Sequence, residues 1–171
     1  MDRHLISVCG PNGAGKSTFT KTVFSTLNWP IVDPDIYSSQ GIGEIAAGKL
    51  SIRIINSYLA EGISFIKEST LTSNFDFAKF NHAKELGYEN ILIYLALPSV
   101  EESLQRVARR VAAGGHTIPV ETILRRFEKS LKNLERAKKI VDHYFIISSA
   151  NAYHIQDEFQ KMEGIIKSFS P

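Results

Sequence analysis

Cysteine is almost absent from this sequence of 171 residues, which contains only Cys9. An internal disulfide needs two cysteines, so a disulfide-stabilised scaffold is excluded, and the composition fits a reducing compartment. No apolar run approaches the roughly 20 residues that a membrane-spanning helix requires. The first apolar run already begins at Leu5, which leaves no room for a signal peptide. We therefore expect a cytoplasmic protein.

Net charge is also small, at +2 from 20 basic and 18 acidic residues, which makes nucleic-acid binding an unlikely role. Half of the basic residues fall between Arg106 and Lys139, where the acids are Glu121, Glu128 and Glu135. Such a run is either a solvated helical face or a segment that folds over phosphates. The sequence has no repeats or linker, and its 43% hydrophobic content fits one domain over residues 1–171.

One short stretch matches a phosphate-binding loop, or Walker A motif, at every fixed position of the pattern GxxxxGK[ST]. Its glycines allow backbone N–H groups to point at phosphate oxygens, and the helix that follows adds the positive end of its dipole. Lys16 is expected to reach the β- and γ-phosphates, and Ser17 to offer its hydroxyl to Mg²⁺. We therefore expect ATP and Mg²⁺ as cofactors, with a nucleotide site made of Gly10, Pro11, Asn12, Gly13, Ala14, Gly15, Lys16, Ser17 and Thr18.

Apolar runs alternate with segments of helical periodicity along the rest of the chain. Strands are predicted at 5–9, 29–32, 62–68, 90–97 and 143–147. Helices are predicted from 17 to 24, in 41–60 as two helices broken near Gly48, and at 73–86, 100–113, 120–141 and up to 169. This alternation predicts a three-layer α/β/α P-loop NTPase fold with a five-stranded, mostly parallel sheet.

Ligands of such sheets bind at the carboxyl ends of the strands, where Asp33, Asp35 and Glu68 are expected to lie. The apolar strand at 90–97 ends without the acid of a Walker B motif, and the base-reading motif of GTPases and the ABC signature are missing. A carboxylate after the second strand then suits a small kinase, with Asp35 as the base for a substrate hydroxyl. Asp33 can instead cap the turn, and an Asx-turn is the alternative for Asp35. Glu68 and Thr70 are candidates to bind substrate hydroxyls or a magnesium-bound water, or to cap the next helix.

Four motifs occur in the order of one known family: GPNGAGKS at 10–17, the turn at 33–35, FIKESTL at 65–71 and GGHTIP at 114–119. Together they resemble the zeta-toxin-like family of P-loop kinases, especially its short members. The resemblance implies transfer of phosphate from ATP to the sugar 3′-hydroxyl of UDP-N-acetylglucosamine. It places Asp35 as the catalytic base and Glu68 and Thr70 on the substrate element E-x-T. An antitoxin-type protein partner is a further implication.

The phosphate-stabilising arginines of that family have no clean match in this sequence. Gly115 and His116 stand where one is expected, and the arginines occur as the pairs Arg109-Arg110 and Arg125-Arg126. We expect residues 106–126 to form a mobile helical lid whose paired arginines complete the site. His116 is either a loop residue or a phosphate contact when charged. Asn151 follows the fifth strand, where related kinases meet the adenine.

These observations favour an ATP-dependent phosphotransferase that acts on a hydroxyl of a small metabolite, with UDP-N-acetylglucosamine the first candidate. A sugar, shikimate-type or polynucleotide kinase would share the phosphate-binding loop and the acid after strand two. A protein of another class, a nucleotide-dependent switch that acts through a protein partner, would respond to that partner instead. Stimulation of ATP turnover by a metabolite or by a protein discriminates between these classes.

Overall fold

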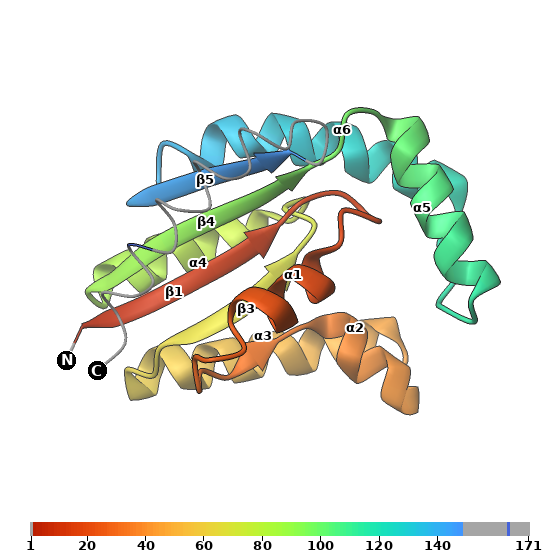
Figure 1. Ribbon diagram of the computed structural model, residues 1–171. Coiled ribbons are helices and arrows are strands. Elements are labelled where there is room, and N and C mark those ends of the chain that lie inside the picture. The colour runs from red at the N-terminus through yellow and green to blue at the C-terminus, as the bar shows by residue number, and fades with distance from the viewer. Residues whose placement is uncertain (1, 149–163, 165–171) are drawn as a thin grey trace.

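A five-stranded parallel sheet forms the centre of the computed structural model of this protein, which describes residues 2–148 and 164. The strands are β1 (Arg3–Cys9), β2 (Ile31–Val32), β3 (Phe65–Ser69), β4 (Tyr88–Ala96) and β5 (His143–Ser148). Their order across the sheet is β2-β3-β1-β4-β5, and each of the four neighbouring pairs is parallel (Figure 1). The α/β architecture predicted from the sequence is confirmed, and the phosphate-binding loop follows the central strand.

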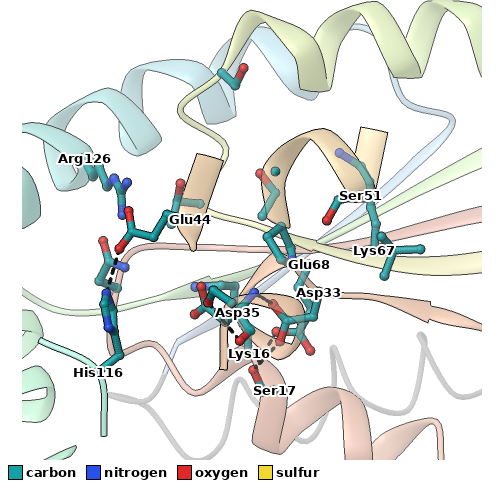
Figure 2. A pocket seen from close by; sticks show the side chains of 18 of the residues that line it. Lys16, Ser17, Asp33, Asp35, Glu44, Ser51, Lys67, Glu68, His116 and Arg126 are labelled. Carbon is teal, nitrogen blue, oxygen red and sulfur yellow. Dashed lines mark hydrogen bonds and ion pairs between the residues drawn. The ribbon is translucent and has the colours of Figure 1, made fainter. Parts of the chain in front are cut away.

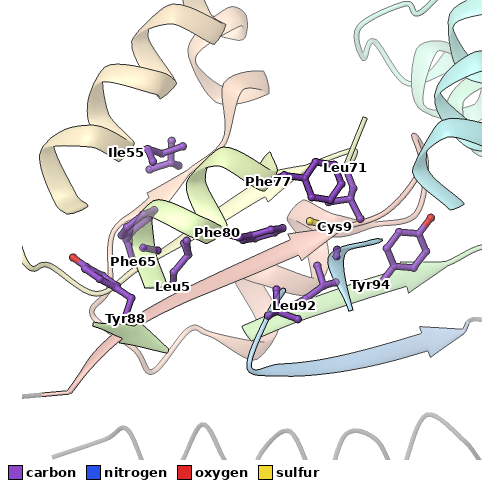
Figure 3. Close-up of a cluster of buried hydrophobic side chains, with 14 of the residues drawn as sticks. Leu5, Cys9, Ile55, Phe65, Leu71, Phe77, Phe80, Tyr88, Leu92 and Tyr94 are labelled. Carbon is purple, nitrogen blue, oxygen red and sulfur yellow. The ribbon is translucent and has the colours of Figure 1, made fainter. Parts of the chain in front are cut away.

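Helices cover both faces of this sheet because successive strand residues point to opposite sides. They are α1 (Lys16–Val23), α2 (Pro34–Tyr37), a π-helical turn η1 (Ser38–Ile42), α3 (Glu44–Glu61), α4 (Asn74–Glu85), α5 (Val100–Ala112) and α6 (Val120–Ala137). One buried cluster joins Leu5, Phe65 and Leu92 of the strands to Ile55 of α3 and Phe80 of α4 (Figure 3). A second cluster, on the opposite face, packs Ile6, Val8 and Ile93 against Phe24, which caps α1.

The expected break near Gly48 is wrong, because α3 runs without interruption from Glu44 to Glu61. Its residues Ala47, Ser51, Ile55 and Leu59 recur every four positions and are all buried. A glycine inside a helix costs only about 1 kcal/mol relative to alanine. Burial of this continuous stripe outweighs that cost, so the helix continues through Gly48.

Two predicted boundaries also shift. Gly62, expected to begin a strand, instead ends α3 with a left-handed φ of 70°, and β3 begins at Phe65. The helix predicted at 120–141 ends at Ala137, and the helix predicted up to 169 lies outside the described residues. Within residues 2–148 and 164, no helix combines the length and apolar character that crossing a membrane requires.

The topology places the ends of β1 and β3 side by side. Cys9 pairs with Ser69 in the parallel ladder, so the loop that follows β1 and the turn that follows β3 leave the sheet together. Val32, at the end of β2, pairs with Lys67 on the other edge of β3. The residues after β1, β2 and β3 therefore converge on one edge of the sheet.

Candidate active site

The phosphate-binding loop adopts a conformation that needs glycine at defined points. Gly10, Gly13 and Gly15 have φ values of 143°, 78° and 85°, a region that other residues avoid. A Cβ at Gly10 would lie 2.5 Å from the carbonyl oxygen of Leu95, so a side chain does not fit between the loop and β4. At Gly15 a Cβ would meet no atom within 4 Å, which leaves this side of the loop open.

Lys16 is held at the centre of the loop. Its Nζ donates hydrogen bonds to the carbonyl oxygens of Gly10, at 3.0 Å, and Pro11, at 3.1 Å. Burial lowers the pKa of Lys16, while Glu68 and Asp35 act in the opposite direction. The ammonium group therefore lies in the concave side of the loop, where it can bind the β- and γ-phosphates of a nucleotide.

Helix α1 presents a free N-terminus beside the same loop. Its N-cap is Gly15, which offers no side chain to the first N–H groups, and its first turn contains no acid. The exposed N–H groups and the helix dipole therefore favour an anion at this point. Ser103 of α5 fixes the loop from behind by donating a hydrogen bond of 2.6 Å to the carbonyl oxygen of Asn12.

Two buried carboxylates flank the hydroxyl of Ser17. Ser17 Oγ lies 2.8 Å from Oε2 of Glu68 and 3.3 Å from Oδ2 of Asp33. Asp33 also caps α2 by accepting a hydrogen bond of 2.9 Å from the backbone N–H of Asp35, one of the two roles expected for it. Burial raises the pKa of both Asp33 and Glu68, since the charged form loses hydration there.

A hydroxyl and two carboxylates are a donor set that suits Mg²⁺, which commonly takes one or two carboxylates and completes its octahedron with phosphates and water. Among the described residues, no group of three or more His, Cys, Asp or Glu side chains could hold a metal by itself. A divalent ion beside Ser17, Asp33 and Glu68 would accordingly depend on a nucleotide for its remaining ligands.

Asp35 lies in the first turn of α2, and its side chain is exposed into the same site. Its backbone N–H donates to Asp33 and its backbone carbonyl oxygen accepts from Ser38. In the part of the chain that the structure describes, no donor is bonded to its carboxylate. This carboxylate is free to accept a proton, and its assignment as a base stays a prediction.

The site lies in a cavity of about 570 Å³, within the usual range for small-molecule pockets. The loop at 12–18, α2, the Gly48–Ile55 part of α3 and the end of β3 line it (Figure 2). Of the described residues predicted from the sequence, the cavity brings together Asn12, Gly13, Gly15, Lys16, Ser17, Thr18, Asp35, Glu68, Thr70, Arg110, His116 and Arg126. Gly10, Pro11 and Ala14 lie in the loop without lining the cavity, and Asn151 lies outside the described residues.

The arginine pairs are split by the geometry of their helices. Arg110 and Arg126 line the cavity, as does Arg106, one turn before Arg110. Arg109 and Arg125 are exposed and are not among the described residues of the cavity wall. Each pair thus contributes one arginine to the cavity, because adjacent helical residues point about 100° apart.

Residues that the sequence patterns did not signal also shape the cavity. Oε1 of Glu44, at the start of α3, lies 2.7 Å from Nε2 of His116, and this contact joins the loop after α5 to α3. Figure 2 shows Glu44 between His116 and Arg126. Glu44 and His116 are 72 positions apart, and no spacing in the sequence signals their contact.

A buried ion pair also lies outside the sequence-based expectations. Lys67 of β3 contacts Asp76 of α4, and their side chains are 2% and 4% exposed. A lysine that directly follows the apolar residues 65–66 within a predicted strand is itself a signal, because a buried ammonium group requires an acidic partner.

A parallel α/β sheet with a phosphate-binding loop between β1 and α1 and an acid after β2 defines a kinase-like P-loop protein. The family model described as Zeta toxin matches residues 33–158, which is well over half of the chain. The chain therefore belongs to the Zeta toxin family, and the resemblance inferred from the four motifs is confirmed.

Comparisons with individual proteins identify one sequence relative and several structures of the same fold. An uncharacterised protein of Haemophilus influenzae is 31% identical over 133 residues, which cover 74% of this chain and 94% of that relative. A crystal structure from Chloroflexus aurantiacus is 17% identical with a TM-score of 0.69, covering 99% of this chain and all of its own. One chain in a structure of the PezAT chromosomal toxin–antitoxin system of Streptococcus pneumoniae is 18% identical with a TM-score of 0.65. The match covers 88% of this chain and 70% of that chain.

Proposed function

We propose that this protein is an ATP- and Mg²⁺-dependent kinase that transfers the γ-phosphate of ATP to a hydroxyl of a small metabolite. The carrying observation is that Lys16 and Ser17 of the phosphate-binding loop share one cavity with the unbonded carboxylate of Asp35. The groups proposed to bind the nucleotide and to accept the proton thus line the same cavity. The first acceptor to test is UDP-N-acetylglucosamine, which the family resemblance suggests.

In the half of the cavity that would bind the nucleotide, separate groups bind the phosphates and the magnesium ion. Lys16 and the N–H groups at the start of α1 bind the β- and γ-phosphates. Ser17, Asp33 and Glu68 would hold Mg²⁺, directly or through water. When bound, Mg²⁺ neutralises charge on the β- and γ-phosphate oxygens. Ionised Asp33 and Glu68 then gain a cationic partner, which offsets the cost of burying them.

The acceptor half centres on Asp35. The acceptor hydroxyl attacks the γ-phosphorus, the bond from that phosphorus to the β,γ-bridging oxygen breaks, and ADP leaves. Asp35 accepts the proton of the hydroxyl. Thr70, which lines the same cavity, would orient the acceptor, and Ile52 and Ile55 of α3 supply an apolar wall.

Positive charge from the lid faces the path of the transferred group. Arg110 and Arg126 line the cavity from α5 and α6. Planar guanidinium groups can hold phosphoryl oxygens by paired hydrogen bonds. We include these two arginines, and His116 between them, in the proposed lid.

A radiolabelled transfer assay tests the proposal. The protein is incubated with γ-labelled ATP, Mg²⁺ and UDP-N-acetylglucosamine, with shikimate, simple sugars and a 5′-hydroxyl oligonucleotide as alternative acceptors, and products are identified by mass. We expect label on a metabolite and none with Asp35→Asn. ATP turnover that only a protein stimulates would instead support the nucleotide-dependent switch.

An antitoxin-type protein partner is a separate part of the proposal. It is supported by the family name and by the PezAT neighbour, whose structure is described as a toxin–antitoxin system. Inhibition of the transfer reaction by a purified candidate antitoxin tests it.

A further inference from the structure

The end of β3 presents different residues to its two sides. Successive strand residues alternate, so Lys67 and Ser69 point one way and Glu68 points the other. Glu68 reaches Ser17 at the start of α1. Lys67 and Ser69 reach Asp76 at the start of α4. The same strand end thus carries Glu68 on one side and the buried network of Lys67, Ser69 and Asp76 on the other, and both sides contribute to the wall of the cavity.

The carboxylate of Asp76 is contacted by both Lys67 and Ser69. Lys67 Nζ contacts Oδ1 of Asp76, and Ser69 Oγ donates a hydrogen bond of 2.9 Å to Oδ2. The Lys67 ammonium also lies 5.1 Å from the centre of the Phe80 ring. Both oxygens of the carboxylate are therefore bonded, each to a different residue of β3, which fixes the end of the strand at two positions.

The turn that follows is held in a conformation that its residues do not favour. Leu71 has a φ of 58°, which a leucine rarely adopts. Its N–H donates to Ser69 Oγ at 2.9 Å, and its carbonyl oxygen accepts from Asn133 of α6 at 2.8 Å. Such a backbone persists only when its surroundings over-determine it. Thr70 lies inside this constrained turn and lines the cavity.

We propose that Lys67, Ser69 and Asp76 are positioning residues that hold Glu68 against Ser17 and Thr70 in the cavity. A slip of the strand end by one residue would exchange its two faces and carry Glu68 away from Ser17. Because Asp76 contacts both Lys67 and Ser69, it prevents this change of register. The inference rests on the proposed function, through the role of Glu68 in binding Mg²⁺ with a nucleotide.

Because Lys67 and Asp76 form a buried ion pair, the effect of substitutions on the position of Glu68 can be separated from their effect on stability. Removing one partner leaves a buried charge uncompensated, whereas replacing both with apolar residues often restores stability. The singles Lys67→Met and Asp76→Leu and the double variant K67M/D76L are therefore compared. Unfolding by urea gives their stability, and calorimetric titration gives the affinity for the non-hydrolysable analogue AMP-PNP with and without Mg²⁺.

We expect both singles to be destabilised and the double variant to regain most of the parent stability. The increase in AMP-PNP affinity that Mg²⁺ produces should nevertheless fall at least about tenfold in the double variant, as is usual when the support of a metal ligand is lost. AMP-PNP affinity without Mg²⁺ should stay close to that of the parent. Ser69→Ala removes the hydrogen bonds of Ser69 Oγ with Asp76 and with the Leu71 N–H but leaves Asp76 paired with Lys67, and it should lower the Mg²⁺ effect in the same direction.

Lys84→Met is the matched control. Lys84 lies on α4, as Asp76 does, but its Nζ forms an ion pair with Asp142 at the surface, at a distance of 3.4 Å. It should behave as the parent. A folded double variant or Ser69→Ala variant with the full Mg²⁺ effect would overturn the positioning role and leave the proposed function intact. A parent protein that binds AMP-PNP equally well with and without Mg²⁺ would instead overturn the magnesium role of Glu68, and with it both proposals.

Discussion

Ser17 donates a hydrogen bond of 2.8 Å to Oε2 of Glu68, although the two residues are 51 positions apart. The contact exists because β1 and β3 are neighbours in the parallel sheet, with Val8 beside Glu68. The hydroxyl that ends the phosphate-binding loop is thereby already directed at a buried acid. Protonation of that acid and binding of a cation at the hydroxyl compete for the same oxygens.

Glu68→Gln should stabilise the protein at neutral pH when Mg²⁺ and nucleotide are absent. Burial raises the pKa of Glu68, so the folded state keeps a proton that the unfolded chain releases, and stability falls as pH rises through the raised pKa. The melting temperature of the variant should exceed that of the parent by a margin that grows as the pH rises from the ordinary pKa of a glutamate to the raised pKa of Glu68. The exposed Glu85→Gln is the control, and a margin independent of pH would contradict this account.

Lys16→Ala should abolish phosphate transfer and leave the fold intact. The ammonium group lies among the loop carbonyls of Gly10 and Pro11, where a methyl group cannot neutralise phosphate charge. Loss of a charge donor from such a site costs about 10²–10³-fold or more in rate. Transfer rates and circular dichroism of Lys16→Ala are compared with those of Lys21→Ala, which alters the exposed last turn of the same helix. Parent-like turnover would show that the nucleotide binds elsewhere.

Asp35→Asn should keep nucleotide binding and lose transfer. The amide preserves the size of the side chain but cannot accept the proton of the acceptor hydroxyl, and loss of a general base costs about 10²–10⁴-fold. AMP-PNP titration and single-turnover transfer measure the two effects separately, with the exposed Asp2→Asn as the control. An unchanged transfer rate would move the role of base to Asp33 or Glu68.

Arg110→Ala and Arg126→Ala should reduce kcat, at least one of them by more than about 100-fold, because arginines on a transferring phosphoryl group can contribute about 10³–10⁵ in rate. Their sequence neighbours Arg109 and Arg125 are not among the described residues that line the cavity and serve as matched controls, expected to stay within a few-fold of the parent. Nucleotide affinity should change far less than kcat in every variant. Four parent-like variants would show that this basic segment is a solvated surface.

The parts of the site that follow a local rule could be predicted from the sequence. The loop at 10–17 has fixed spacing, and polar residues at the ends of parallel strands must meet at one edge, which is enough to predict that Asp35 and Glu68 lie together. Contacts between distant segments follow no local rule. The contact between Glu44 and His116 depends on how α3 packs against the loop after α5, and no pattern in the sequence predicts this contact.

Helical phase and burial account for the other differences. Both arginines of each pair were expected to complete the site, but on α5 only Arg106 and Arg110, about one turn apart, line the cavity. The expected break at Gly48 rested on local propensity, which packing of α3 overrides. Lys67 lies within the strand predicted at 62–68. It is buried because α4, which carries its partner Asp76, covers the face of the sheet to which Lys67 points.

The central place of β1 has a consequence for biosynthesis. Residues 5–9 pair with 65–69 on one side, and residues 3–9 pair with 88–94 on the other, so β1 is synthesised before both of its partners and waits nearly 60 residues for β3. Contacts of such long range form slowly, and an unpaired apolar strand is prone to aggregate before its partners are made. The phosphate-binding loop is therefore synthesised before the elements that support it. Nascent chains that end before β3 lack both that strand and the Glu68 carboxylate that faces Ser17.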